Sequence, residues 1–178
     1  IKADDNGIST VVITDKATGA VIASGSSIKF GQEVVVTATV NTGYEFGGFT
    51  SSSSKLASSQ TNAYTFAMCA DNVLLTAYTS KGTSSFNIKY MFESIDGTKY
   101  EERTGITFVA KYQGETESTI EESMILAANG GNISVDGFTK SGFGKIKDDK
   151  TFESVKITGD GNATVYVYYT RNSYTLTI

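Results

Sequence analysis

The side chains that most often carry catalysis and metal binding are scarce in this sequence. It contains no histidine, the commonest general base, and a single cysteine, Cys69. One cysteine without histidine cannot form a closed zinc site. The net charge is −4 and the lysines and arginines are scattered, so the positive patch that nucleic acids require is missing. We therefore expect no enzyme activity, no metal or other cofactor and no nucleic-acid partner.

Covalent cross-links are the next chemistry to weigh. Cys69 and a glutamine such as Gln60 have the residue types of an internal thioester, but the flanking sequence lacks the pattern of thioester domains. An isopeptide bond could join Lys89 or Lys111, both on expected strands, to Asn162. No known spacing supports that bond, and lysines are mostly exposed surface residues. The simpler interpretation is a loop or buried thiol at Cys69 and ordinary surface lysines.

Three acidic sequences could suggest calcium sites: Asp96-Gly97, Asp148-Asp149 and Asp160-Gly161. A calcium loop needs oxygen ligands at dense, alternating positions, and none of the three provides them. Asp and Gly are also the residues that tight turns favour. We interpret all three as turns and expect no metal there.

One strand near the C-terminus carries a pair of tyrosines. Val165, Val167 and Tyr169 share one face of it, which leaves Tyr166 and Tyr168 on the other. These two rings could stack on a sugar or on a protein partner, so Tyr166 and Tyr168 are the candidate ligand contacts. Packing against a neighbouring strand or module is the favoured alternative, because tyrosines on sheets commonly make cross-strand contacts.

The elements that must position these side chains are mainly β-strands. Short segments alternate apolar and polar residues, as half-buried strands do, and Gly, Asn or Asp residues between them suit tight turns. In FNIKYMFE, for example, Phe86, Ile88, Tyr90 and Phe92 share one face. The expected strands lie at residues 9–14, 33–40, 62–68, 72–79, 86–93, 105–113, 152–158 and 163–170.

One segment in the second half has helical spacing instead. Ser118 and Glu121 have the spacing of a capping box, and apolar residues follow at intervals of three to four. Asn129 and Gly130 supply a C-terminal stop. The pattern predicts one short helix at about 118–128. The second half then has the order ββαββ, a β-grasp-like fold in which a helix covers one face of a small sheet.

Length and composition favour two small tandem modules. The chain has 178 residues, of which 39% are hydrophobic, enough for two small cores. Small polar residues at 80–85 are typical of a joint, so we expect modules at 1–82 and 83–172. The chain opens on Ile1 without a methionine or a signal peptide, and we interpret it as an internal fragment. No apolar run is as long as a membrane helix, so we expect no membrane insertion here.

The first module carries a recognisable pattern over about residues 25–79, in the stretches GQEVVVTATVNTGYEFGGFTSS and NAYTFAMCADNVLLTAYT. It resembles the divergent internalin-type B-repeat (Listeria–Bacteroides repeat). Gly43-Tyr44 and Met68 to Val73 follow the family's order and spacing. Phe49 stands where that family usually has tryptophan, and Cys69 where it usually has proline. Phenylalanine can fill the same core site with less area, whereas the cysteine changes the loop.

The second module is similar to a module that precedes such repeats in bacterial surface proteins, and more distantly to mucin-binding-protein repeats. The matching stretches are FNIKYMFESIDGTKYEE, DGFTKSGFGKI and DGNATVYVYYTRNSYTLTI. The run from Tyr168 to Thr177 is where the family commonly ends one module and begins another. The resemblance implies that Arg171-Asn172 is a joint and that residues 173–178 start a further repeat.

The resemblance implies a location and a role more than a chemistry. Such modules occur in tandem in exported proteins of Gram-positive and gut bacteria, as stalks, spacers or adhesive segments. We expect a non-catalytic stalk or adhesive repeat segment of a secreted, extracellular cell-surface protein. Its partners would be neighbouring repeats of the same chain and a host protein or glycan. The alternative is an accessory glycan-binding module of a large extracellular enzyme.

Overall fold

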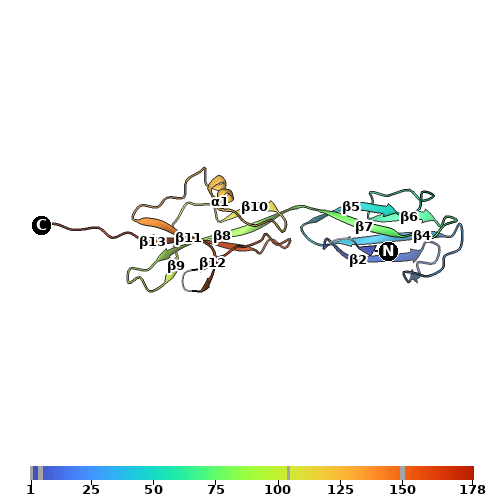
Figure 1. Ribbon diagram of the computed structural model, residues 1–178, viewed down its shortest axis with the longest axis horizontal. Helices are drawn as coiled ribbons and strands as arrows, with labels where there is room; N and C mark the ends of the chain where they lie inside the picture. Colours follow the sequence, from blue (N-terminus) through green and yellow to red (C-terminus); the bar gives the residue numbers. More distant parts are fainter. Residues whose placement is uncertain (1, 4–5, 104, 149–150) are drawn as a thin grey trace. The chain divides into compact units, whose positions relative to one another are not determined.

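The computed structural model describes residues 2–3, 6–103, 105–148 and 151–178 (Figure 1). It is mainly β, with 48% of residues in strands and 4% in helix, which confirms the expected fold class. The chain divides into two compact units, residues 1–82 (unit 1) and 83–178 (unit 2). No helix in the described ranges is long and apolar enough to cross a membrane.

Unit 1 contains two sheets. One has the strand order β3-β2-β4-β6 and is antiparallel throughout, and the other has the order β1-β7-β5. In the second sheet β1 runs parallel to β7, and its two described residues pair with Thr76 and Ala77, whereas β5 pairs with β7 along its whole length. The strands are β1 (Lys2–Ala3), β2 (Ile8–Asp15), β3 (Val21–Ile22), β4 (Glu33–Val40), β5 (Tyr44–Ser51), β6 (Ala63–Ala67) and β7 (Leu75–Lys81).

The core of unit 1 follows from alternation within the strands. Val34, Val36 and Ala38 are buried along β4, as the period of two predicts. Strand β5 was not among the predicted strands, and it supplies the largest core side chain, Phe49, which is 0% exposed. Its sequence is interrupted at Gly48, where φ is +144° and the register with β7 shifts. Only glycine adopts that backbone readily, so the break in the apolar pattern is a bulge inside a strand.

Unit 2 is one sheet with the order β10-β8-β13-β11-β12, and β9 pairs with the end of β8. The first and last strands, β8 and β13, are adjacent, central and parallel, and the other pairs are antiparallel. The elements are β8 (Thr83–Glu93), β9 (Tyr100–Glu102), β10 (Lys111–Glu115), α1 (Glu122–Ala128), β11 (Phe138–Asp148), β12 (Thr151–Glu153) and β13 (Thr164–Arg171).

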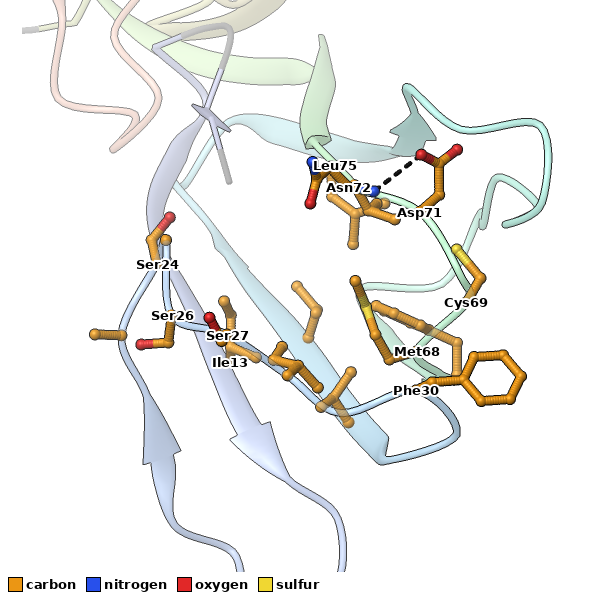
Figure 2. Close-up of a pocket in the computed structure, with 17 residues that line it drawn as sticks. Ile13, Ser24, Ser26, Ser27, Phe30, Met68, Cys69, Asp71, Asn72 and Leu75 are labelled. Atoms are coloured by element: carbon orange, nitrogen blue, oxygen red, sulfur yellow. Dashed lines mark hydrogen bonds between the residues drawn. The ribbon is translucent and has the colours of Figure 1, made fainter.

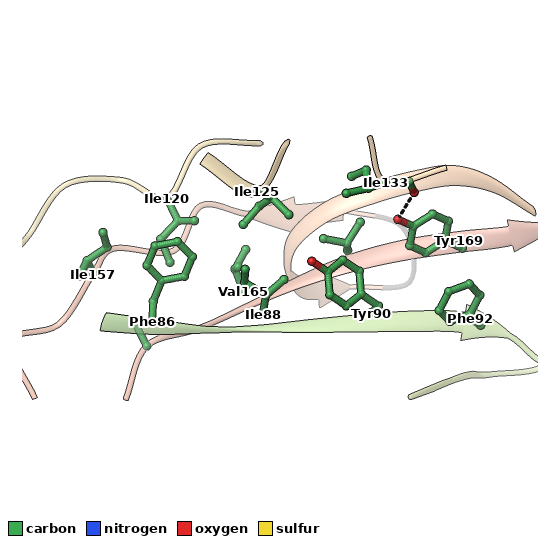
Figure 3. Close-up of a cluster of buried hydrophobic side chains, with 12 residues drawn as sticks. Phe86, Ile88, Tyr90, Phe92, Ile120, Ile125, Ile133, Ile157, Val165 and Tyr169 are labelled. Atoms are coloured by element: carbon green, nitrogen blue, oxygen red, sulfur yellow. Dashed lines mark hydrogen bonds between the residues drawn. The ribbon is translucent and has the colours of Figure 1, made fainter. Parts of the chain in front are cut away.

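The core of unit 2 lies on the sheet face that α1 covers (Figure 3). As predicted, Phe86, Ile88, Tyr90 and Phe92 are buried along β8, where they meet alternate residues of β13 and two isoleucines from the helical region. The buried Tyr169 hydroxyl lies in this core and donates a hydrogen bond of 2.7 Å to the backbone carbonyl of Ile133. That bond satisfies a hydroxyl which would otherwise destabilise the core.

Three local predictions were wrong. The helix begins at Glu122 rather than near Ser118, and the Ser118 hydroxyl donates to the Glu115 carbonyl instead of capping a helix. The observed N-cap, Glu121, makes no side-chain cap hydrogen bond. Residues 106–110 are irregular, and only 111–115 form the expected strand. Of the expected strand at 152–158, only the first two residues are in a strand, because β12 ends at Glu153. The polar stretch 80–85 does contain the boundary between the two units, although its residues other than Gly82 lie in β7, which ends at Lys81, and β8, which begins at Thr83.

Residues 173–178, hereafter the tail, form no strand. Tyr174 and Leu176 are 79% and 87% exposed, and Ile178 is exposed as well. The last backbone hydrogen bond of the segment joins the Asn172 N–H to the Gly137 carbonyl at 2.9 Å, and none follows it within the described residues. The tail therefore adds no side chain to the core of unit 2.

Candidate functional site

The predicted tyrosine pair lies on the face of the unit 2 sheet opposite α1. Tyr168 is 5% exposed, because its ring packs against Tyr100 at 5.2 Å, nearly perpendicular, and against Phe152 at 5.1 Å. This burial raises the pKa of the Tyr168 hydroxyl. Tyr166 is half-buried and lies 6.2 Å from Tyr168 in a stacked arrangement. The structure therefore places the two rings together, with only Tyr166 partly open.

The surroundings of Tyr166 are polar. Lys89 is its register partner on β8, and the Lys89 ammonium pairs with a Glu102 carboxylate oxygen at 2.9 Å. This pairing raises the pKa of Lys89. Phe152 covers Gly142, where any Cβ would lie 2.0 Å from the phenylalanine ring. The half-buried Tyr166 ring can contact part of a ligand. Because Tyr168 is buried, the pair does not present two exposed rings on which a sugar could stack.

Replacement by alanine should affect the stability of unit 2 differently at the two tyrosines. Tyr168→Ala is expected to destabilise unit 2 by about 3 kcal/mol, because it removes a buried ring between two others. Tyr166→Ala should cost about 1 kcal/mol or less, since the ring is partly solvated. The urea midpoint of the unit 2 transition measures both variants. Equal losses would mean that the face is more open than its ring contacts indicate.

A second candidate is a pocket of about 660 Å³ in unit 1, the unit 1 pocket (Figure 2). Its walls are apolar side chains from four strands, and two loops, residues 23–30 and 68–73, complete it. Phe30, at the rim, points outward and is 79% exposed. The strand residues are Ile13 from β2, Val34 and Val36 from β4, Phe66 from β6 and Leu75 from β7.

The one carboxylate of the unit 1 pocket is already partnered. The Asp71 carboxylate accepts a hydrogen bond of 2.7 Å from the Ser53 hydroxyl and one of 2.9 Å from the Asn72 N–H. The Ser53 bond is the main reason that the pKa of Asp71 is lowered. Cys69 is half-buried on the pocket wall, where no histidine can activate it. The lining combines apolar strand residues with polar loop residues, and none of its described members pairs a nucleophile with a base. The polar loop residues are Ser24, Ser26, Ser27, Asp71 and Asn72.

Alternation alone could not have found this pocket. The pattern marks Ile13, Val36 and Leu75 as core residues, whether the core is closed or open on one side.

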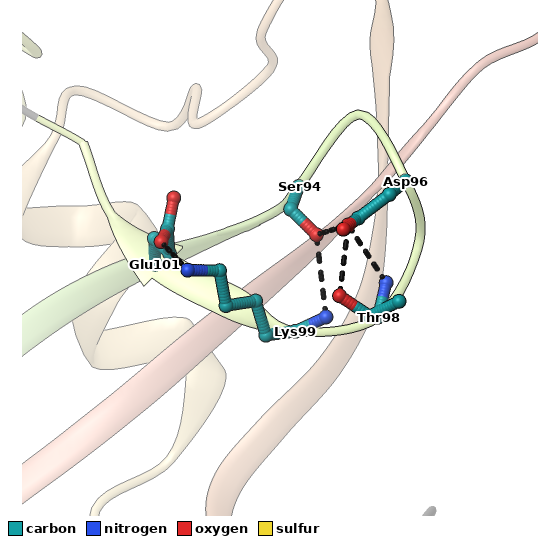
Figure 4. A network of polar contacts seen from close by, with 5 residues as sticks. All are labelled: Ser94, Asp96, Thr98, Lys99 and Glu101. Carbon is teal, nitrogen blue, oxygen red and sulfur yellow. Dashed lines mark hydrogen bonds and ion pairs between the residues drawn. The ribbon is translucent and has the colours of Figure 1, made fainter.

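Two of the three acidic sequences expected to be turns, Asp96-Gly97 and Asp160-Gly161, are turns, whereas Asp148 of the third is the last residue of β11. Asp96 accepts hydrogen bonds from the Ser94 hydroxyl, from the Thr98 N–H at 3.1 Å and from the Thr98 hydroxyl at 2.8 Å (Figure 4). Asp160 accepts bonds from Thr158 and Asn162 in a similar way. Asp149 lies outside the described residues. Within the described ranges, no group of three or more Cys, Asp or Glu side chains could hold a metal ion.

The Asp96 turn should have a measurable pH signature. The Ser94 and Thr98 donors lower the pKa of Asp96 from its ordinary 3.8 to about 2. A carboxyl with a depressed folded pKa stabilises the fold above the unfolded pKa and loses that contribution as the pH falls through the folded one. The turn should therefore be fully stabilised above about pH 4 and weaken towards pH 2. Carbon-detected NMR titration checks this, and Ser94→Ala should raise the pKa, whereas an unchanged value would contradict the role of Ser94.

Two of the cross-link candidates, Lys89 and Asn162, have other partners in the structure. The Lys89 ammonium pairs with Glu102, and the Asn162 side-chain amide donates to Asp160 at 2.9 Å. These contacts give Lys89 and Asn162 ordinary surface roles and favour neither as half of an isopeptide bond.

Comparison with known proteins finds one family model that matches part of the chain. Residues 9–82 match the family model of the divergent InlB B-repeat domain. The match covers nearly all of unit 1 and confirms the resemblance found in the first half of the sequence. No curated protein and no solved structure matches the chain.

Proposed function

We propose that this chain is a non-catalytic stalk or adhesive repeat segment of a secreted bacterial cell-surface protein. The observation that carries the proposal is the match of residues 9–82 to the divergent InlB B-repeat domain. That domain family is typical of bacterial surface proteins. Extracellular localisation at the cell surface, and the absence of catalysis, belong to the same proposal.

The architecture supports a role in a tandem array. Each unit has its own hydrophobic cluster, and only Gly82 stands between the last strand of unit 1 and the first strand of unit 2. Unit 2 has a helix on one face of a sheet whose first and last strands are central and parallel. This order supports the proposal that unit 2 is a β-grasp-like module.

Surface digestion of intact bacteria tests the proposal directly. A protease added to intact cells of the producing organism should release peptides of this chain, because a surface segment is accessible without lysis. A cytoplasmic enzyme of the same cells is the control and should remain intact. Recovery of this chain's peptides only after lysis would overturn the surface assignment.

A second candidate function is that of an accessory glycan-binding module. The half-buried Tyr166 ring, which lies beside the Lys89–Glu102 ion pair, favours it. A glycan array separates the two functions. A stalk should bind no glycan selectively, whereas a lectin-like module should show selective binding that Tyr166→Ala abolishes. Tyr166 is the residue to change, because truncation of the buried Tyr168 would also destabilise unit 2.

A further inference from the structure

We propose that β6 of one copy of this chain pairs with β6 of a second copy, so that the four-stranded sheets of the two copies join into one antiparallel sheet. The twofold axis of this pair passes through Thr65. The inference goes beyond the stalk function, because a stalk segment need not pair laterally and a segment that pairs laterally need not be a stalk.

The outer edge of β6 carries backbone groups without hydrogen-bond partners. The Asn62 carbonyl and the Met68 N–H, next to the two ends of β6, both bond on the side of β4. Because the two sides of a strand alternate, Ala63, Thr65 and Ala67 direct their N–H and C=O groups away from β4. The Ala63 carbonyl accepts a threonine hydroxyl at 3.2 Å, and the other groups have no partner among the described residues.

This edge lacks the features with which proteins usually protect a free strand, namely charged residues, proline, bulges and very short length. The sequence of β6 is AYTFA, and its register with β4 shows no shift. Other edge strands are protected: β3 has two residues, β9 is YEE, β12 has three residues, and β10 carries Lys111 and Glu115. The edge of β5 is covered at Phe49 by Ser59. Of these edges, β6 is the one suited to receive a strand.

The sequence of β6 is complementary to itself in the antiparallel direction. With Thr65 opposite Thr65 of the second copy, Ala63 lies opposite Ala67 and Tyr64 lies opposite Phe66. The side chains of Ala63, Thr65 and Ala67 are small and exposed, so the outer face of the joined sheet has room for them. Threonine pairs and aromatic pairs both stabilise neighbouring strands. This complementarity is the reason to assign a second copy, rather than another protein, to the edge.

The inner face of β6 supports the same register. The rings of Tyr64 and Phe66 pack on the core side of unit 1 with their centres 5.0 Å apart, yet both side chains are only half-buried. In the proposed register they form the non-hydrogen-bonded pairs, whose side chains lie closer together than those of hydrogen-bonded pairs. Pairing would therefore cover apolar ring surface that the edge leaves open in a single copy.

The contact is small, so the association should be weak. The five residues of β6 span about 17 Å, an extent that places the interface among transient ones of less than about 1,200 Å². We expect a dissociation constant between about 10 μM and about 1 mM. Because both copies use the same edge, association should stop at two copies, and sedimentation velocity of the full chain measures this. Growth beyond two copies would contradict the proposed symmetry.

Thr65→Lys tests the edge. In the dimer this change places two like charges directly opposite each other, so the dissociation constant should rise by at least about tenfold. Thr37→Lys is the matched control, because Thr37 is exposed on the same face of the sheet, one strand further from the edge. The control should dimerise nearly as the wild type does. Amide dispersion in NMR spectra confirms that both variants are folded, and equal weakening by the two would overturn the proposal.

Cysteine cross-linking tests the register, in a Cys69→Ser background that removes the single native thiol. Thr65→Cys should form a disulfide-linked dimer on mild oxidation, because the Cα atoms of a hydrogen-bonded antiparallel pair lie about 5.5 Å apart, within the range of a disulfide. Ala63→Cys and Ala67→Cys should each fail to cross-link alone, since each is at least about 13 Å from its equivalent in the second copy. A mixture of these two variants should cross-link.

The outcomes are read on a non-reducing gel and by sedimentation. Equal cross-linking of the three single variants would indicate random collision and overturn the register. A chain that stays monomeric to about 1 mM, or a dimer that Thr65→Lys leaves intact, would overturn the pairing of β6. Either result would leave the stalk function to surface digestion, which measures location and not association.

Discussion

Replacement of Phe86 by alanine is expected to destabilise unit 2 by about 3–5 kcal/mol. Phe86 is fully buried at the start of β8, packs in the cluster that contains Ile120 and Val165, and meets the Tyr112 ring edge-on at 6.2 Å. Truncation removes these contacts and leaves a cavity that strands and helix cannot close. Small domains are stable by only about 5–15 kcal/mol, so the unit 2 transition should move to much lower urea concentration.

Lys89→Ala is the matched control for this prediction. Lys89 lies on the same strand, on the opposite face, and its ammonium forms a half-exposed ion pair with Glu102. Such pairs contribute about 0–1 kcal/mol. The midpoint for Lys89→Ala should therefore stay near that of the wild type. If Lys89→Ala and Phe86→Ala lowered the midpoint equally, the assignment of the two faces of β8 would be wrong.

The alternation of apolar and polar residues predicted the strands that have one face in a hydrophobic core and the other face towards solvent. β4 and β8 each have one face in a core and show their buried residues at every second position. β13 follows the same alternation at Val165, Val167 and Tyr169, and it departs from it at Tyr168, which is buried on the opposite face. The period of a strand is two whatever it packs against, so the pattern is readable without the partner strand. The predicted segments 33–40 and 86–93 fall within the observed strands for this reason.

Elements that depend on distant partners were not predictable in this way. β5 contains Gly47 and Gly48, against which the Tyr78 ring packs, so two small residues interrupt the apolar pattern of a real strand. Residues 106–110 show the opposite case. They alternate like a strand, but Ile106 and Phe108 pack on the core cluster from an irregular segment, and Ala110 is exposed. Propensity is a weak guide where tertiary packing decides the backbone.

The start of the helix was missed for a local reason. The spacing of Ser118 and Glu121 allows a capping box, but the Ser118 hydroxyl and N–H both bond to the Glu115 carbonyl. The same donor can form a turn or cap a helix, and the sequence does not distinguish the two. The helical stop at Asn129 and Gly130 was predicted correctly, because Gly130 has the positive φ that favours glycine.

The sequence predicted only one property of the candidate site, namely that its two tyrosines share a face of the strand. Alternation placed Tyr166 and Tyr168 on one face, and the structure confirms that they lie together. Whether the rings are open depends on Tyr100 and Phe152, which reach the same face from β9 and β12. These short strands carry too few residues to show a period. Burial of Tyr168 was therefore visible only in three dimensions.

A substitution in the core of unit 1 can test whether the two units fold independently. This core also contains a fully buried aromatic residue. Phe49 is 0% exposed, and its ring lies 5.1 Å from Phe46 and 6.3 Å from Tyr64. Its backbone also exchanges hydrogen bonds of 2.7 and 3.0 Å with Ser59, which ties an irregular loop to β5. Through its ring and its backbone, Phe49 thus connects β5, β6 and the loop between them.

Phe49→Ala is expected to cost unit 1 about 3–5 kcal/mol while leaving unit 2 folded. A unit of this size buries only about 60% of its unfolded surface, so such a loss should leave much of unit 1 unfolded at room temperature. In an amide NMR spectrum, signals from residues 6–82 should weaken and collapse, and those from 83–172 should stay dispersed. Phe30→Ala, at an exposed rim position, is the control and should leave both sets unchanged. Simultaneous collapse of both sets would show that the two units fold as one, because two separate cores would respond separately to a cavity in one of them.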